Sequence, residues 1–132
     1  GSDTIIVHYE VSKNIKSDLR NIRKLGKKAG IAFNPDTDYK LIRPFYDDLD
    51  YILIMSVFPG FGGQKFIKST LESMENLVHE TRNHKITLAV DGGVNLDTID
   101  KIYETGIDVT IVGSALYGAS NVKKRYFDLI NE

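Results

Sequence analysis

The chain has 132 residues and a formal net charge of −1; 42% of its residues are hydrophobic and 27% are charged. This size and composition suit one globular domain with its own core. The near-neutral charge gives no electrostatic footprint for nucleic acid or an anionic membrane, and the absence of cysteine excludes disulfides and thiolate metal sites. No apolar run is long enough to span a bilayer and no signal segment opens the chain, so the cytoplasm is the expected compartment. Gly1-Ser2 resembles the remnant of a cleaved tag, which leaves residues 3–132 as the expected domain.

Five short apolar runs predict β-strands. In chain order they cover residues 4–8, 30–33, 51–57, 86–90 and 109–112. None of them alternates cleanly between apolar and polar residues, which is typical of strands that are buried on both faces.

Helical patterns separate these strands and follow the last one. Their apolar marker residues span 15–25, 41–49, 71–78, 96–103 and 122–130. Gly26 and Gly106 lie where C-terminal caps are expected, and Asn95 is the expected N-cap of the fourth helix. Pro44 either begins or kinks the second helix.

The alternation of strands and helices predicts a parallel sheet with right-handed crossovers. Two architectures fit it: an open, doubly wound sheet of five strands, and part of a (β/α)₈ barrel. Both bind ligands at the carboxyl ends of their strands. Three glycine motifs lie at such ends, namely Pro59-Gly60-Phe61-Gly62-Gly63-Gln64, Val90-Asp91-Gly92-Gly93-Val94 and Val112-Gly113-Ser114-Ala115.

Asp91 is the only carboxylate within these motifs, so it is the candidate for proton chemistry. A carboxylate that emerges from an apolar strand can abstract a proton next to a carbonyl. The alternative is that Asp91 only forms an Asx turn before Gly92 and Gly93. Glycine at these positions lets backbone N–H groups approach a bound anion.

The other motif residues also carry two interpretations each. Gly113 and Ser114 predict a phosphate site at a helix start, or a tightly packed turn. The loop around Phe61 either closes over a ligand or is a mobile surface loop. Met55 is more typical of a core than of a site, and His8 is more typical of a hydrogen-bonded structural residue than of a metal ligand. No His-x-His or His-x-x-x-His spacing offers a self-sufficient metal site.

Taken together, the motifs resemble the ribulose-phosphate 3-epimerase family. Besides the three glycine motifs, the resemblance rests on Val7-His8-Tyr9-Glu10, Gly30-Ile31-Ala32-Phe33-Asn34-Pro35 and Met55-Ser56-Val57, which occur in order through nearly the whole chain. It implies a (β/α)₈ barrel that interconverts ribulose 5-phosphate and xylulose 5-phosphate in the pentose phosphate pathway. In that family two aspartates act on opposite faces of the sugar, with a divalent metal (zinc, iron, manganese or cobalt) at the carbonyl.

The resemblance also implies roles for individual residues. Asp91 corresponds to the second catalytic aspartate, which is also a metal ligand, and Met55 corresponds to a pocket-lining methionine. The positions that correspond to substrate and phosphate binding are Gly60, Phe61, Gly62, Gly63, Gly92, Gly93, Gly113 and Ser114.

The chain departs from the family pattern in what it lacks. The family's His-x-Asp motif and a further histidine ligand, both on early strands, are absent, so the five predicted βα units correspond to family strands four to eight. One of four metal ligands and one of two acid–base groups remain. We therefore expect the isolated chain to be inactive. The alternatives are a non-catalytic, sugar-phosphate-binding half-barrel and an epimerase of a related ketose phosphate. The expected partners are a small sugar phosphate and a second copy of the chain, with neither nucleic acid nor membrane.

Overall fold

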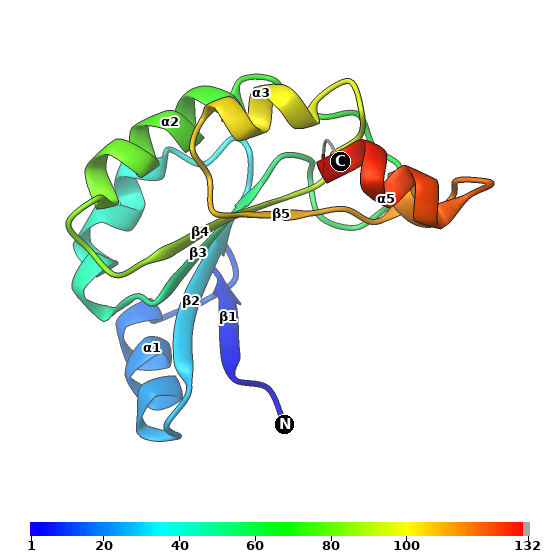
Figure 1. Ribbon diagram of the computed structural model, residues 1–132. Coiled ribbons are helices and arrows are strands. Elements are labelled where there is room, and N and C mark those ends of the chain that lie inside the picture. Colours follow the sequence, from blue (N-terminus) through cyan, green and yellow to red (C-terminus); the bar gives the residue numbers. More distant parts are fainter. Residues whose placement is uncertain (131–132) are drawn as a thin grey trace.

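The computed structural model describes residues 1–130 and contains one parallel sheet whose strands lie in chain order (Figure 1). The strands are β1 (Thr4–His8), β2 (Lys28–Phe33), β3 (Tyr51–Met55), β4 (Thr87–Asp91) and β5 (Val109–Ile111). All five predicted strands are confirmed, with ends that differ by one or two residues. The second begins earlier, at Lys28, and the third ends at Met55 because the chain there turns into a loop.

The helices alternate with the strands. They are α1 (Ile15–Lys24), the 3₁₀ helix η1 (Tyr39–Asp48), α2 (Thr70–Thr81), α3 (Ile99–Glu104), α4 (Ser114–Tyr117) and α5 (Val122–Ile130). Asn14 caps α1, since its Oδ1 accepts a hydrogen bond of 3.1 Å from the N–H of Ser17. Gly26 and Gly106 follow α1 and α3 with φ of 71° and 82°, as expected for C-terminal caps.

Three helical details differ from the sequence expectation. The second helix is a 3₁₀ helix with Pro44 inside it, because proline offers no N–H for an α-helical turn. Asn95 is not the N-cap of α3: its Oδ1 accepts from the N–H of Asp97 at 2.9 Å, and the helix begins only after Thr98. The short helix α4 was not predicted, since a single turn carries too few residues for a periodic pattern.

The core lies between the sheet and the helices. The strand side chains that face the helices are almost fully buried; they are Ile31, Phe33, Ile52, Ile54, Leu88 and Val90. They share one core cluster with Leu19 of α1, Met74 and Leu77 of α2, and Ile102 of α3. Each such side chain contributes about 1.5–3 kcal/mol to the stability of the fold. This layer fixes the sheet on which the strand ends are displayed.

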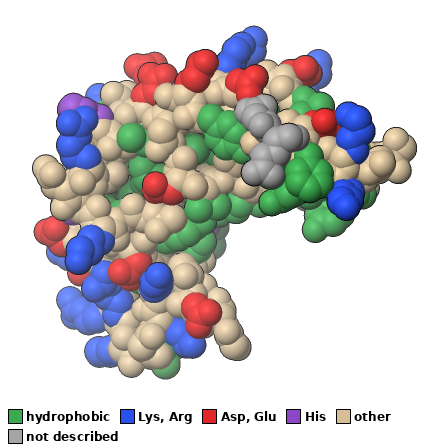
Figure 2. Space-filling view, in the orientation of Figure 1, with side chains coloured by type: hydrophobic (Ala, Val, Ile, Leu, Met, Phe, Trp, Pro, Cys, Tyr) green, Lys and Arg blue, Asp and Glu red, His purple; other side chains and the backbone are tan. Residues whose placement is uncertain are grey.

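The opposite face of the sheet is open and apolar. Right-handed crossovers between strands in sequential order place the helices on one side only, which excludes the doubly wound alternative and is the arrangement of an arc of a (β/α)₈ barrel. Figure 2 shows hydrophobic side chains gathered in the resulting hollow. Ile6, Val109 and Ile111 are 37–39% exposed there. We call this surface the concave face.

Two aspartates fix the sheet at the amino ends of its strands. Asp50 Oδ2 accepts from the N–H of Ala29 at 2.9 Å, and Asp108 Oδ2 accepts from the N–H of Leu88 at 2.8 Å. Each bond joins the start of one strand to the residue just before the next. They therefore set the register of β2 with β3 and of β4 with β5. Within residues 1–130, no helix is both long and apolar enough to cross a membrane.

Candidate functional site

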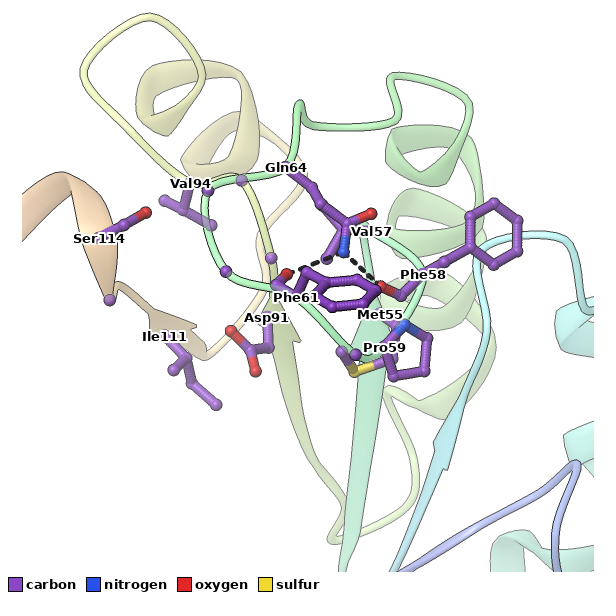
Figure 3. A pocket seen from close by; sticks show the side chains of 16 residues that line it. Met55, Val57, Phe58, Pro59, Phe61, Gln64, Asp91, Val94, Ile111 and Ser114 are labelled. Carbon is purple, nitrogen blue, oxygen red and sulfur yellow. Dashed lines mark hydrogen bonds between the residues drawn. The ribbon is translucent and has the colours of Figure 1, made fainter.

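Three loops meet at the carboxyl edge of the sheet and enclose a pocket of about 350 Å³ (Figure 3). They follow β3, β4 and β5, and they carry the three glycine motifs. The lining includes every site residue predicted from the sequence, namely Met55, Gly60, Phe61, Gly62, Gly63, Asp91, Gly92, Gly93, Gly113 and Ser114. The structure thus brings all of them together, because parallel strands end at the same edge of a sheet.

Asp91 lies in the floor of this pocket. It is the last residue of β4, in register with Met55 on β3 and Ile111 on β5. In Figure 3 its carboxylate lies between Ile111 on one side and Met55 on the other. Burial raises the pKa of Asp91, and a hydrogen bond from the backbone N–H of Gly92 acts in the opposite direction. A partly desolvated carboxylate of this kind is a stronger base than an exposed one.

The backbone at Asp91 is held by Ser56, a residue that the sequence prediction did not include in the site. The N–H of Ser56 donates to the backbone oxygen of Asp91 at 2.8 Å. The hydroxyl of Ser56 lies 3.0 Å from the same backbone oxygen and 2.6 Å from the backbone oxygen of Gly92. Ser56 is fully buried. Its position inside the Met55-Ser56-Val57 motif was the only sequence signal for this role.

Gly92 and Gly93 are required by the packing of two loops. Both have positive φ, 116° and 65°. A Cβ atom on Gly92 would lie 2.4 Å from Val57 Cγ2, and one on Gly93 would lie 2.6 Å from the backbone nitrogen of Phe66. The loop after β3 therefore packs directly on the backbone that follows Asp91, a close approach that only glycine permits.

The loop after β3 is organised by Gln64 rather than by its aromatic residue. Gln64 Nε2 donates to the backbone oxygens of Phe58 at 2.7 Å and Phe61 at 2.8 Å (Figure 3). Phe61 is 86% exposed, so it does not anchor the loop to the protein. Its ring instead stands at the mouth of the pocket, where it is available to a ligand.

The third wall of the pocket is the turn from β5 into α4. The Gly113 oxygen accepts from the N–H groups of Leu116 and Tyr117, both at 3.0 Å. No side chain caps this helix. The first N–H groups of a helix have no partner within it, so the turn offers backbone donors to the pocket.

The residues present do not fit a divalent metal. Within residues 1–130 no three His, Cys, Asp or Glu side chains gather closely enough to hold a metal ion. Asp91 is the one side chain of these types in the pocket lining. A structural or catalytic zinc takes three or four protein ligands, and a single carboxylate does not supply them.

Comparison with known proteins agrees with this geometry. A model of the ribulose-phosphate 3 epimerase family matches residues 1–117. The chain belongs to the ribulose-phosphate 3-epimerase family. The ribulose-phosphate 3-epimerase of Bacillus subtilis (strain 168) is 39% identical over 127 residues, which are 94% of this chain and 58% of the relative. That of Escherichia coli (strain K12) is 39% identical over 126 residues, 94% of this chain and 56% of the relative.

Solved structures of TIM-barrel proteins share the fold. The 3-hexulose-6-phosphate synthase of Salmonella typhimurium superposes with a TM-score of 0.72 at 22% identity, and the match covers 99% of this chain and 61% of the synthase chain. A tryptophan synthase alpha-subunit from Pyrococcus furiosus superposes with a TM-score of 0.74 at 20% identity, and the match covers 100% of this chain and 56% of the alpha-subunit. This member of the epimerase family thus spans somewhat more than half of the barrels and relatives that it matches.

Proposed function

We propose that this chain is part of a ribulose-phosphate 3-epimerase that interconverts ribulose 5-phosphate and xylulose 5-phosphate. The observation that carries the proposal is the position of Asp91, a half-buried carboxylate in one pocket with three glycine-rich loops. The names of its relatives supply the substrate. We place the reaction in the pentose phosphate pathway and in the cytoplasm.

In this proposal Asp91 moves a proton at C3 of the sugar. The C3–H bond is adjacent to the C2 carbonyl, so its electron pair passes into the carbonyl as the carboxylate takes the proton, and an enediolate results. Burial raises the pKa of Asp91, which makes its carboxylate a stronger base toward the C3 proton. Epimerisation is complete when a proton returns to C3 from the opposite face.

The phosphate would bind to backbone donors. Gly92, Gly93, Gly113 and Ser114 line the same pocket, and glycine loops let N–H groups approach an anion without a side chain between them. The open loop around Phe61 would cover the sugar and exclude water.

The isolated chain lacks the groups for a complete turnover. The pocket holds one acid–base carboxylate, whereas inversion needs one group on each face of the sugar. We propose that the second group and a divalent metal (zinc, iron, manganese or cobalt) belong to a complete barrel. A sugar-phosphate-binding half-barrel is the second candidate function, and an epimerase of a related ketose phosphate is a variant of the first.

An equilibrium assay with ribulose 5-phosphate tests the catalytic part of the proposal. The chain is supplemented with each metal in turn, and xylulose 5-phosphate is measured against a buffer control. We expect binding without turnover. Turnover at the rate of an ordinary epimerase would show that a second copy supplies the missing groups. Failure of ribulose 5-phosphate and inorganic phosphate to perturb Gly92, Gly93 and Gly113 in NMR spectra would refute the assigned site.

A further inference from the structure

The turn that forms the third wall of the pocket is contacted by a side chain from outside the pocket. Arg125, in the first turn of α5, donates a hydrogen bond from Nη1 to the backbone oxygen of Ala115 at 3.0 Å. Ala115 comes directly after Ser114, the last pocket-lining residue of the turn from β5 into α4. The bond spans ten positions of the chain, and in Figure 1 α5 lies beside the carboxyl end of β5.

The helix α4 is too short to hold its own shape. It has four residues, Ser114–Tyr117, and no side chain caps its start. A single helical turn is unstable alone, because it orders several residues for few hydrogen bonds. At its far end the N–H of Ala119, which would bond to Ala115 in a longer helix, donates to the oxygen of Leu116 at 3.2 Å. Arg125 therefore supplies the donor that the helix itself does not give to the Ala115 oxygen.

The helix that carries Arg125 is anchored to the body of the domain by other residues. Leu129 of α5 is 4% exposed and belongs to the core. The hydroxyl of Tyr103, on α3, donates to the backbone oxygen of Leu129 at 3.2 Å. Arg125 therefore reaches α4 from a helix that is already held in place, so its hydrogen bond can fix α4 relative to the sheet.

Arg125 differs from the two lysines beside it. Lys123 is exposed, and Lys124 forms an ion pair of 2.9 Å with Asp128 on the same helix. Arg125 is half-buried and bonds to a backbone oxygen of another helix. A hydrogen bond from a charged donor is stronger than one between neutral groups. The basic run thus contains one cation that contacts the pocket wall and two that provide comparisons for it.

We propose that Arg125 is a positioning residue of the phosphate site. Its hydrogen bond to Ala115 holds α4 against α5, and this keeps Gly113 and Ser114 in the pocket wall, where their backbone N–H groups bind the phosphate of the sugar. Arg125 acts through α4 and does not itself contact the ligand. The identity of the ligand rests on the proposed function, whereas the contact between Arg125 and α4 does not.

Arg125→Met tests the positioning role, because methionine keeps an unbranched side chain that suits a helix and removes the N–H donors. Lys123→Met is the matched control, since it removes the same charge from an exposed position of the same helix. Affinities are measured from the shift of the Gly113 N–H in spectra of the ¹⁵N-labelled full chain. Arg125→Met should weaken binding of inorganic phosphate and of ribulose 5-phosphate alike, about tenfold. Lys123→Met should leave both affinities nearly unchanged at physiological salt.

Amide hydrogen exchange provides a readout that needs no ligand. The N–H groups of Leu116 and Tyr117 bond to the Gly113 oxygen, both at 3.0 Å. Their exchange should become faster in Arg125→Met and stay unchanged in Lys123→Met, because α4 opens locally when it loses this contact. The N–H of Val90, in the buried strand β4, should exchange at the same rate in both variants. Equal acceleration at Val90 would show a global loss of stability and contradict the inference.

The outcomes separate this inference from the proposed function. If Arg125→Met binds inorganic phosphate with wild-type affinity, the positioning role is wrong and the proposed function stands. Equal losses in Arg125→Met and Lys123→Met would show a general effect of charge and would also overturn the role of Arg125. If neither ligand shifts Gly113 in the wild-type chain, the proposed phosphate site fails, and this inference fails with it.

Discussion

The hydroxyl of Ser56 lies 3.0 Å from the backbone oxygen of Asp91 and 2.6 Å from that of Gly92, so a buried side chain on the loop after β3 holds the end of β4. This contact connects the fold to the proposed chemistry. It sets the direction in which the Asp91 side chain leaves the strand, and it joins two of the three loops that enclose the pocket.

Ser56→Ala should destabilise the chain by about 1–3 kcal/mol, because it removes the hydroxyl that donates to the partly buried backbone oxygen of Gly92. Urea unfolding followed by circular dichroism measures the change. Ser69→Ala is the matched control, since Ser69 is exposed and its side chain makes no capping bond to α2. Equal stability of the Ser56 and Ser69 variants would contradict the role given to Ser56.

Gly92→Ala should be more harmful than the same change at Gly62. Gly92 has a φ of 116° and no room for a Cβ atom next to Val57, whereas a Cβ on Gly62 would meet nothing within 4 Å. We expect a loss of roughly 1–3 kcal/mol or more at Gly92 and less than about 0.5 kcal/mol at Gly62. Thermal melts of the two variants provide the comparison, and a Gly92 variant as stable as the Gly62 variant would overturn the packing argument.

Asp91→Asn should abolish proton transfer without loss of the fold. In a complete barrel that contains this chain, we expect a fall in turnover on the order of 10²- to 10⁴-fold, the usual contribution of a general base. Steady-state assays and circular dichroism of the same sample measure activity and fold. Near-normal turnover of the variant would remove Asp91 from the mechanism.

The raised pKa of Asp91 also predicts how stability changes with pH. The folded chain holds this proton more tightly than the unfolded chain does. The stability that protonated Asp91 adds to the folded chain is therefore fully present below the ordinary pKa of 3.8. It is lost as the pH rises through the higher pKa that Asp91 has in the folded chain. The unfolding free energy of the wild type minus that of Asp91→Asn should fall over this interval and then level off. A difference that rises with pH would contradict the assigned direction.

The open concave face predicts self-association of the isolated chain. β1 and β5 are unpaired edges, and Ile6 on β1 is 38% exposed. Ile6→Lys should shift the chain toward monomer in sedimentation velocity experiments across a range of concentrations. Leu25→Lys, which changes an exposed leucine after α1, is the control and should leave the association unchanged. A wild-type chain that stays monomeric at high concentration would refute the prediction.

The sequence by itself determined the strands, most of the helices and the glycine loops. These features are encoded locally: apolar runs such as Ile52 to Ile54 predict buried strands, and a glycine such as Gly26 permits the positive φ that ends a helix. Local patterns were insufficient where neighbouring signals compete. Pro44 turned the second helix into a 3₁₀ helix, and Asn95 formed a turn instead of the cap of α3.

Only the tertiary structure decided the strand order, and with it the choice between a doubly wound sheet and an arc of a barrel. It also decided which residues support the site. Ser56 and Gly92 are 36 positions apart, and the carboxylate of Glu10, after β1, accepts a hydrogen bond from the N–H of Asn34, after β2. The physical reason is that hydrogen bonds and burial between such residues depend on strand pairing and register, which are long-range properties that no local pattern of residue types encodes.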